Sequence, residues 1–445
     1  MLRFLRRRRF WVILSGVTAA LAAGSVGGRF YVESISPEYE PRSFLVEGEK
    51  IEPAEDEIGT KLRAGVDATR LRADVEYLAS KELGGRDNLS PGSELARAYL
   101  VKRLEELGLS KCFGSSFLQE VVEDDEPNGT NVAGRILGEN PDADAVLLVA
   151  HYDHLGTEDG ELHRGADDNA SGVAIALEVA RLLASEGLHG KHQVIFLFPD
   201  AEEPPDVRTD RMGSSFFVEN PPVPVERLRL AIVLDVMGGQ PIRRSPDLFF
   251  VMGAESSPDL VRLVRSVPQP KERARYEMMS VAMIEAEPYL PWVRKSKSDY
   301  HAFRLAERPF LFITAGTTPR YHQPDDTPDS LSYEKMAAET GFLADLVHRA
   351  SLDETKIAHF PRAVDQVQDV RLALRIVEDI LADPGDVLED TQEALREDRE
   401  RLLEFKTTLE AGHTLSKAEY RELMLIGLRM QCALARPTYT MCTKF

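Results

Sequence analysis

Cysteine is scarce in this sequence. The chain has 445 residues and only three cysteines, Cys112, Cys432 and Cys442. Three cysteines are too few for a disulfide scaffold, and no two of them have the spacing of a zinc finger, so we expect no metal site built on sulfur. In an exported chain, Cys432 could pair with Cys442.

The sequence also lacks an excess of basic charge. It has 54 lysines and arginines against 74 aspartates and glutamates, which gives a formal net charge of −20. Binding to nucleic acid requires a basic surface that faces the phosphates, and the only dense basic cluster lies at the N-terminus. We therefore expect no nucleic-acid partner.

A long uncharged apolar stretch occurs only near the N-terminus. Four consecutive arginines, residues 6–9, precede the stretch at residues 10–28, as in an export signal or a single membrane anchor. The stretch is close to the minimum of about 17 residues for a spanning helix, and its glycine and serine content weakens it. Residues 1–30 are therefore either a signal peptide, cleaved after Ala22, or a retained membrane anchor. The rest of the chain is expected in an extracytoplasmic space, either the periplasm or the cell surface.

Composition divides the remaining chain into three parts. Residues 31–59 are rich in Pro, Glu and Ser without periodicity, which is typical of a linker. Residues 60–354 are long enough for one large domain. Residues 355–445 contain charged helical patterns with apolar stripes and predict a helical C-terminal extension, in which Ser416 and Glu419 have the spacing of a capping box. This extension either packs on its own domain or forms a docking or dimerisation hairpin, and the oligomeric state stays open.

Five short apolar runs alternate with helical patterns in the main domain. They are residues 145–150, 194–198, 230–234, 248–252 and 309–313. Runs that are apolar on both faces, with helical patterns between them, are typical of buried strands in an α/β sheet. The sequence therefore predicts an α/β fold with a mixed, largely parallel central sheet flanked by helices.

Residues that can bind metal follow several of these runs. They are His151, Asp153, Glu202, Glu203 and Asp235, together with Asp167 and Asp168 at the start of a helix and Tyr321-His322 after the last run. The carboxyl ends of strands in an α/β sheet form the edge at which ligands bind, so these side chains should converge there. Histidines and carboxylates without thiolates suit zinc, with manganese or cobalt as alternatives.

At this point the sequence resembles a known family. The segments "HYD", "GADDNASGVA", "AEE" followed by "MGS", "LDVMGG", "SDYHAF" and "YHQPDDT" occur in the order found in the co-catalytic dizinc exopeptidases. That group contains the bacterial leucyl aminopeptidases, aminopeptidase Y and glutamate carboxypeptidase. The resemblance covers about residues 66–352 and implies a zinc-exopeptidase fold of the phosphorylase/hydrolase-like type, two zinc ions per chain and a peptide substrate.

The resemblance also implies a division of the metal ligands. His151 and Asp235 would bind one zinc ion, and Glu203 and His322 the other. Asp168 would bridge the two ions. Of the two adjacent aspartates, Asp167 is then the one expected to hydrogen-bond the loop. Related structures have a cis peptide after the bridging aspartate, so we expect one between Asp168 and residue 169.

Three further residues receive catalytic roles from the same resemblance. Glu202 would be the general base and acid, and Asp153 would orient His151 by holding its second ring nitrogen. The position of Tyr321 resembles that of a tyrosine that stabilises the oxyanion in part of the family, and a packing role is the alternative. Together these assignments predict an aminopeptidase that hydrolyses N-terminal residues of peptides with a metal-activated water.

Three alternatives on the same fold stay open. A glutamate-releasing carboxypeptidase would need basic pocket residues that the sequence does not identify. A glutaminyl cyclase works with one zinc ion, which the presence of His151 disfavours. A catalytically inactive, receptor-like ectodomain would lack metal ligands, and none is missing here.

Overall fold

The computed structural model describes residues 39–42, 51, 53–140, 142–187, 189–207, 209–270, 272–285 and 298–444. The expected signal or anchor at residues 1–30 and most of the expected linker lie outside the described residues. Among the residues that are described, no helix is both long enough and apolar enough to cross a membrane.

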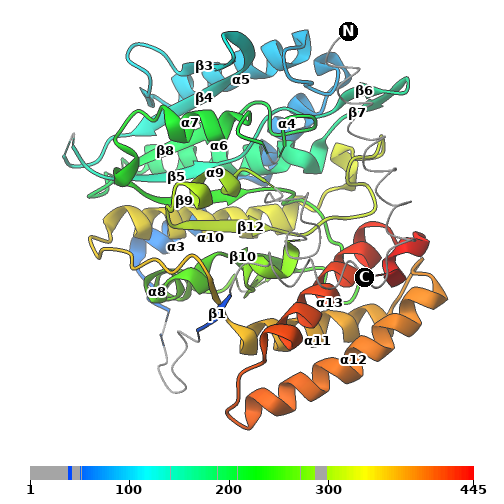
Figure 1. The fold of residues 1–445 in the computed structure, drawn as a ribbon. Helices are drawn as coiled ribbons and strands as arrows, with labels where there is room; N and C mark the ends of the chain where they lie inside the picture. Colours follow the sequence, from blue (N-terminus) through cyan, green and yellow to red (C-terminus); the bar gives the residue numbers. More distant parts are fainter. Residues whose placement is uncertain are drawn as a thin grey trace.

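A nine-stranded sheet runs through the centre of the molecule (Figure 1). Its order is β11-β10-β12-β9-β5-β8-β4-β2, and β3 pairs with β4. The strands are β2 (Ser110–Lys111), β3 (Leu118–Glu123), β4 (Glu126–Ile136), β5 (Ala145–Val149), β8 (Gln193–Phe198), β9 (Leu228–Leu234), β10 (Leu248–Met252), β11 (Arg275–Met278) and β12 (Phe310–Thr314). The four central strands β8, β5, β9 and β12 are parallel, whereas β4 pairs with β8, and β10 with β12, in the antiparallel sense. The predicted mixed, largely parallel sheet is confirmed, and the five apolar runs form β5, β8, β9, β10 and β12.

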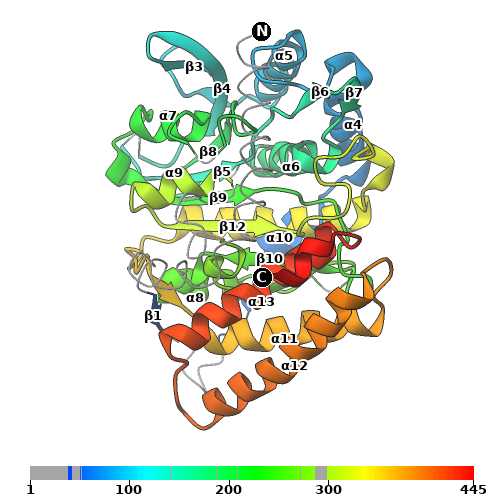
Figure 2. The same cartoon turned by 45° about the vertical axis from the view of Figure 1, so that its right-hand side comes forward.

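Helices cover both faces of the sheet (Figures 1 and 2). Within β5, Val146 and Leu148 point into one hydrophobic cluster and Leu147 and Val149 into the other, because side chains alternate along a strand. The first cluster includes α3 (Glu57–Ala64), α4 (Ala68–Leu78), α5 (Pro91–Glu106), α6 (Gly172–Ser185), α8 (Pro258–Ser266) and α10 (Tyr333–Leu352). The second includes α7 (Gly213–Glu219), α9 (Tyr300–Leu305), α11 (Gln366–Ala382), α12 (Glu389–Glu410) and α13 (Lys417–Ala435). Burial on both faces explains why these strands are apolar throughout.

The C-terminal helices α11, α12 and α13 belong to this second layer. Leu402 and Phe405 of α12 are fully buried in the same cluster as Phe250 and Phe312 of the sheet. The helix α13 begins with the expected capping box at Ser416. The disulfide between Cys432 and Cys442, which the sequence allowed, is also present. The extension is therefore continuous with the core of the sheet.

A buried carboxyl group joins these helices to the segment after β11. Asp369 of α11 accepts hydrogen bonds from the backbone N–H of Ser280 at 2.8 Å and from the hydroxyl of Tyr420 in α13 at 2.9 Å. Burial raises the pKa of Asp369 to about 7. The carboxyl group is therefore a titratable contact within the interface between the extension and the rest of the fold.

Truncation of Phe405 tests whether the extension and the sheet unfold together. Phe405→Ala removes a fully buried ring, and we expect it to lower the free energy of unfolding by about 3–5 kcal/mol. Val367→Ala, at a half-exposed position of α11, is the matched control and should change it by less than about 0.5 kcal/mol. Urea unfolding followed by circular dichroism measures both. A separate early transition in Phe405→Ala, with the main transition unmoved, would contradict a shared core.

The raised pKa of Asp369 predicts a pH dependence of stability. The unfolded chain releases this proton near pH 4 and the folded chain near pH 7. Between these pH values the folded chain keeps the Asp369 proton and the unfolded chain does not. The stability that the neutral carboxyl group contributes is therefore complete below about pH 4 and is lost as the pH rises to about 7. Asparagine cannot ionise, so Asp369→Asn should gain stability relative to the parent chain over this interval. Urea unfolding at pH 5, 6 and 7 measures the difference, and a difference that is constant with pH would disprove the assignment.

Candidate dinuclear metal site

The candidate site lies at the carboxyl edge of the parallel strands. His151 follows β5, Glu202 and Glu203 follow β8, and Asp235 follows β9 directly. The parallel pairing of β5 with β8 and β9 brings these strand ends to one edge. The remaining predicted residues come from the segment Ala166–Ser171 that precedes α6 (Asp168), the loop after β5 (Asp153) and the loop between β12 and α10 (Tyr321 and His322).

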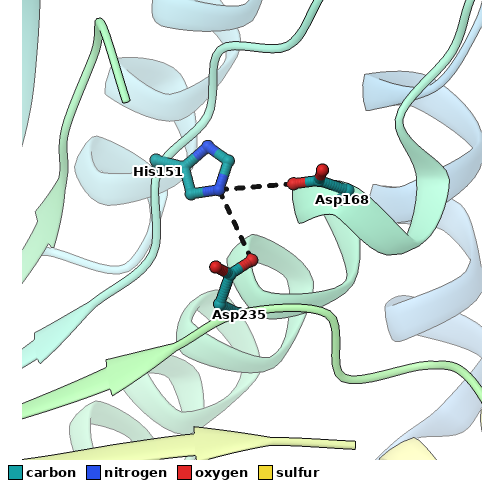
Figure 3. Close-up of side chains that lie close together, drawn as sticks. All are labelled: His151, Asp168 and Asp235. Carbon is teal, nitrogen blue, oxygen red and sulfur yellow. Dashed lines mark ion pairs between the residues drawn. The ribbon is translucent and has the colours of Figure 1, made fainter. Parts of the chain in front are cut away.

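One group of side chains gathers around His151 (Figure 3). Its Nε2 lies 3.4 Å from Asp168 Oδ1 and 3.5 Å from Asp235 Oδ1. The Glu202 Oε2 atom lies 3.8 Å from the same nitrogen. His151, Asp168 and Asp235 thus each offer one atom that could bind the same metal ion. The carboxylate of Glu202 lies beside them.

A second group gathers around His322. Its Nε2 lies 3.0 Å from Asp168 Oδ2 and 3.2 Å from Glu203 Oε2. The other Glu203 oxygen, Oε1, lies 2.8 Å from Nδ1 of His154. The two oxygens of Asp168 therefore face different groups, Oδ1 toward His151 and Oδ2 toward His322.

Several atoms at the centre of these groups are buried and have no hydrogen-bond partner. They are His151 Nε2, Asp168 Oδ2, Glu202 Oε1, Asp235 Oδ1 and His322 Nε2. Buried polar atoms are almost always hydrogen-bonded, so convergent ones without partners indicate coordination of a cation. Imidazole nitrogen with carboxylate oxygen is a donor set that zinc accepts. The residues therefore fit the metal ions that the sequence implies.

Asp153 connects His151 to the two adjacent glutamates. Its two carboxylate oxygens accept hydrogen bonds from the backbone N–H groups of Glu202 and Glu203, both at 3.2 Å. Its Oδ1 lies 3.6 Å from His151 Nδ1, which is longer than a hydrogen bond, while its carbonyl oxygen lies 3.3 Å from that nitrogen. The carboxylate of Asp153 is thus held by the glutamate backbone, and its side chain lies beyond hydrogen-bond distance of the His151 nitrogen that the resemblance assigned to it.

The two glutamates have different electrostatic environments. Burial raises the pKa of Glu202 well above its usual value, and the charges of Glu203 and Asp235 raise it further against the influence of His151. Burial and the charge of Asp168 also raise the pKa of Glu203. His322 and His154 lower it by more, and the pKa of Glu203 is about 2. Adjacent carboxyl groups with separated pKa values are suited to different tasks.

Tyr321 lies against the ring of His322. The two ring centroids are 4.0 Å apart and nearly parallel, at 20°. Burial raises the pKa of Tyr321 well above its usual value, and the nearby charges of Asp168 and Glu203 raise it further, so its hydroxyl remains protonated. The side chain packs on a predicted ligand and also carries a proton at the edge of the site.

Asp167 hydrogen-bonds the backbone of a neighbouring loop. Its Oδ1 accepts a hydrogen bond of 2.7 Å from the backbone N–H of Gly238, in the loop after β9. The backbone N–H groups of Asp167 and Asp168 in turn donate to Asp326. The expectation that Asp167 bonds a loop is confirmed, and the peptide between Asp168 and Asn169 is cis as expected.

Sequence reasoning missed two residues at this site, His154 and Arg86. Arg86 is fully buried and donates to four backbone carbonyls, those of Tyr152 (2.8 Å), Gly165 (2.9 Å), Leu78 and Arg164. It thereby connects the loop after β5 to the loop that precedes Asp168. The segments "HYDH" and "LGGRD" contained both residues, but a neighbouring histidine and an arginine in a loop carry no signal of their burial.

Comparisons with known proteins agree with this geometry. Residues 131–347 match the family model described as Peptidase family M28. The chain is 26% identical over 315 residues to human Endoplasmic reticulum metallopeptidase 1. The alignment covers 65% of this chain and 31% of the human protein. The chain is 24% identical over 241 residues to Aminopeptidase YwaD of Bacillus subtilis, which covers 53% of this chain and 47% of the relative.

The chain spans less than two thirds of the length of the curated relatives that it matches. Among solved structures, the LapA aminopeptidase of Legionella pneumophila has a TM-score of 0.51 at 16% identity, over 72% of this chain and 79% of that one. At 16% identity, this similarity shows a shared fold and nothing about activity. The family match, the order of the motifs and the convergence of their residues together show that residues 131–347, which carry the site, are similar to peptidase family M28.

Proposed function

We propose that the protein is a dizinc aminopeptidase, which removes N-terminal residues from peptides by hydrolysis. The observation that carries the proposal is the position of Asp168, whose two carboxylate oxygens face two separate groups of histidine and carboxylate atoms. The names of two relatives, an aminopeptidase and a metallopeptidase, support this class of reaction.

In this proposal the two groups hold two metal ions. His151 and Asp235 would bind one zinc ion, Glu203 and His322 the other, and Asp168 would bridge them. The bound ions would polarise the scissile carbonyl and lower the pKa of the attacking water. His154 would fix the orientation of the Glu203 carboxylate through the contact at 2.8 Å.

Glu202 would move the proton. Its high pKa and its position next to His151 suit a carboxylate that takes a proton from the attacking water at an oxygen atom. As the new C–O bond forms and the peptide C–N bond breaks, Glu202 returns that proton to the nitrogen of the leaving amine. Asp153 would hold Glu202 in place through the backbone, and the Tyr321 hydroxyl would donate to the developing oxyanion.

We also propose an extracytoplasmic location, either secreted or anchored by the N-terminal segment. The arginines and the apolar stretch at residues 6–28 support it. The disulfide between Cys432 and Cys442 supports it independently, because disulfides persist in oxidising compartments.

Substitution of Glu202 tests the proposed mechanism. Glu202→Gln keeps the shape of the side chain and removes its ability to accept a proton, so we expect kcat for an aminoacyl-anilide to fall about 100-fold to 10,000-fold. Metal analysis of the same preparation should still find two zinc ions per chain. Glu226→Gln, at an exposed position, is the control. Activity that survives in Glu202→Gln would refute the role of Glu202, and a parent chain that binds fewer than two ions would refute the dinuclear site.

Substitution of Arg86 tests whether it positions the ligand loops. Arg86→Lys keeps a buried positive charge but cannot reach four carbonyls, so we expect zinc affinity to fall about 10-fold to 100-fold, as for other residues that support ligands. Competition with a chelator measures the affinity, and urea unfolding of the metal-free protein measures the general loss of stability. A variant that is less stable but binds zinc with unchanged affinity would mean that Arg86 serves only the fold.

A further inference from the structure

The C-terminal tip, defined here as residues 432–442, reaches the candidate site. It begins in the last turn of α13 and lies outside residues 131–347, which match the family model. Arg436 donates a hydrogen bond from Nη2 to the backbone carbonyl of Tyr321 at 3.3 Å. Tyr321 directly precedes His322 and stacks on its ring. Figure 2 shows the end of α13 beside the loop between β12 and α10.

The tip is held in one conformation by several independent contacts. The disulfide joins its two ends, Cys432 and Cys442. Within the tip, the backbone N–H of Arg436 donates to Cys432 at 2.8 Å, and that of Tyr439 donates to Arg436 at 2.9 Å. Pro437 accepts a hydrogen bond of 3.1 Å from Leu388, the residue before α12. Arg436 is therefore positioned before any ligand arrives, which lowers the entropic cost of binding.

The guanidinium group of Arg436 has unused hydrogen-bonding capacity. The residue is exposed, and across the described residues the one hydrogen bond given for its side chain is to the Tyr321 carbonyl. A guanidinium has five N–H donors, and its planar fork matches a carboxylate. The net charge of −20 repels an anionic group on a substrate, and a local cation such as Arg436 would offset that repulsion.

Distance limits the substrates for which this contact is possible. Seven covalent bonds separate the Tyr321 oxygen from His322 Nε2, so the guanidinium lies within about 11 Å of that nitrogen. An extended peptide spans about 3.3–3.6 Å per residue. A dipeptide or tripeptide bound at the metal-type atoms would therefore bring its terminal carboxylate near Arg436, and a long peptide would extend past it.

We propose that Arg436 binds the free terminal carboxylate of a peptide of two or three residues that is cleaved at this site. This inference rests on the proposed peptidase function and names its substrate class. The same carboxylate recognition would serve an aminopeptidase that acts on short peptides or a carboxypeptidase that releases the terminal residue. The substrates of the test distinguish these two cases.

The first experiment compares peptide acids with peptide amides. The parent chain should cleave an unblocked dipeptide with at least about tenfold higher kcat/KM than its C-terminal amide, because a charge-assisted bidentate contact is lost in the amide. Arg436→Gln should bring this acid-to-amide ratio close to one, mainly through KM, and Arg436→Lys should restore part of it. Arg371→Gln, at an exposed arginine of α11 that pairs with Glu277, is the matched control and should keep the ratio.

A binding measurement separates recognition from turnover. In the Glu202→Gln background, calorimetry should find that the dipeptide acid binds at least about tenfold more tightly than the amide, and that Arg436→Gln removes the difference. Opening the disulfide with Cys432→Ser and Cys442→Ser should reduce the same difference, because the tip is then no longer held.

The outcomes distinguish the inference from the function on which it rests. Equal cleavage of acid and amide by the parent chain would overturn the role of Arg436 and leave the aminopeptidase intact. Cleavage of N-blocked dipeptide acids but not of aminoacyl-anilides, with an acid preference that Arg436→Gln removes, would overturn the aminopeptidase and uphold Arg436. A parent chain that cleaves none of these substrates would overturn both.

Discussion

Burial of carboxylates at one edge of the sheet is the constraint on which the rest of the structure depends. Asp168, Glu202, Glu203 and Asp235 are brought together with only a few histidines to balance them. Carboxylates that are removed from water and face one another are strongly unfavourable unless cations compensate them. The two divalent ions proposed above would supply that compensation directly. Arg86 is fully buried, and burial lowers its pKa to about 10, while nearby carboxylates raise it. Arg86 therefore stays protonated and adds a positive charge behind the site.

Three further aspartates connect the loops that carry the ligands. Asp153 binds the backbone of the two glutamates, Asp326 binds the backbone of Asp167 and Asp168, and Asp167 binds Gly238 beyond Asp235. Each of these contacts joins a loop from one strand to a loop from another. The backbone N–H groups satisfy the hydrogen-bonding capacity of these buried carboxyl oxygens. These three aspartates therefore connect the loops that carry the proposed metal ligands.

The strands and the main site residues could be predicted from sequence because their signals are local. An apolar run marks a buried strand, and polar residues at its end, such as His151 or Asp235, mark the ligand edge. The direction of a strand has no such signal, so the antiparallel pairing of β10 with β12 could not be read from two similar runs. Arg86 and His154 were missed for a related reason. Their partners lie at the ends of other strands, and an arginine that binds only carbonyls leaves no matching acid in the sequence.

The C-terminal helices link the stability of the fold to the shape of its site. Apolar residues on the second face of the sheet, among them Phe250 and Phe312, would be exposed without α11, α12 and α13. The last helix of this layer, α13, ends beside the loop that carries Tyr321. Its Gln431 donates to the carbonyl of Met283 at 3.0 Å, and Arg436, the residue after the helix, donates to the carbonyl of Tyr321. Because the same helix buries core residues and carries the tip, packing of the core fixes where the guanidinium lies. The extension thus places an exposed guanidinium group beside the loop that carries His322, without contributing any of the residues that surround the metal positions.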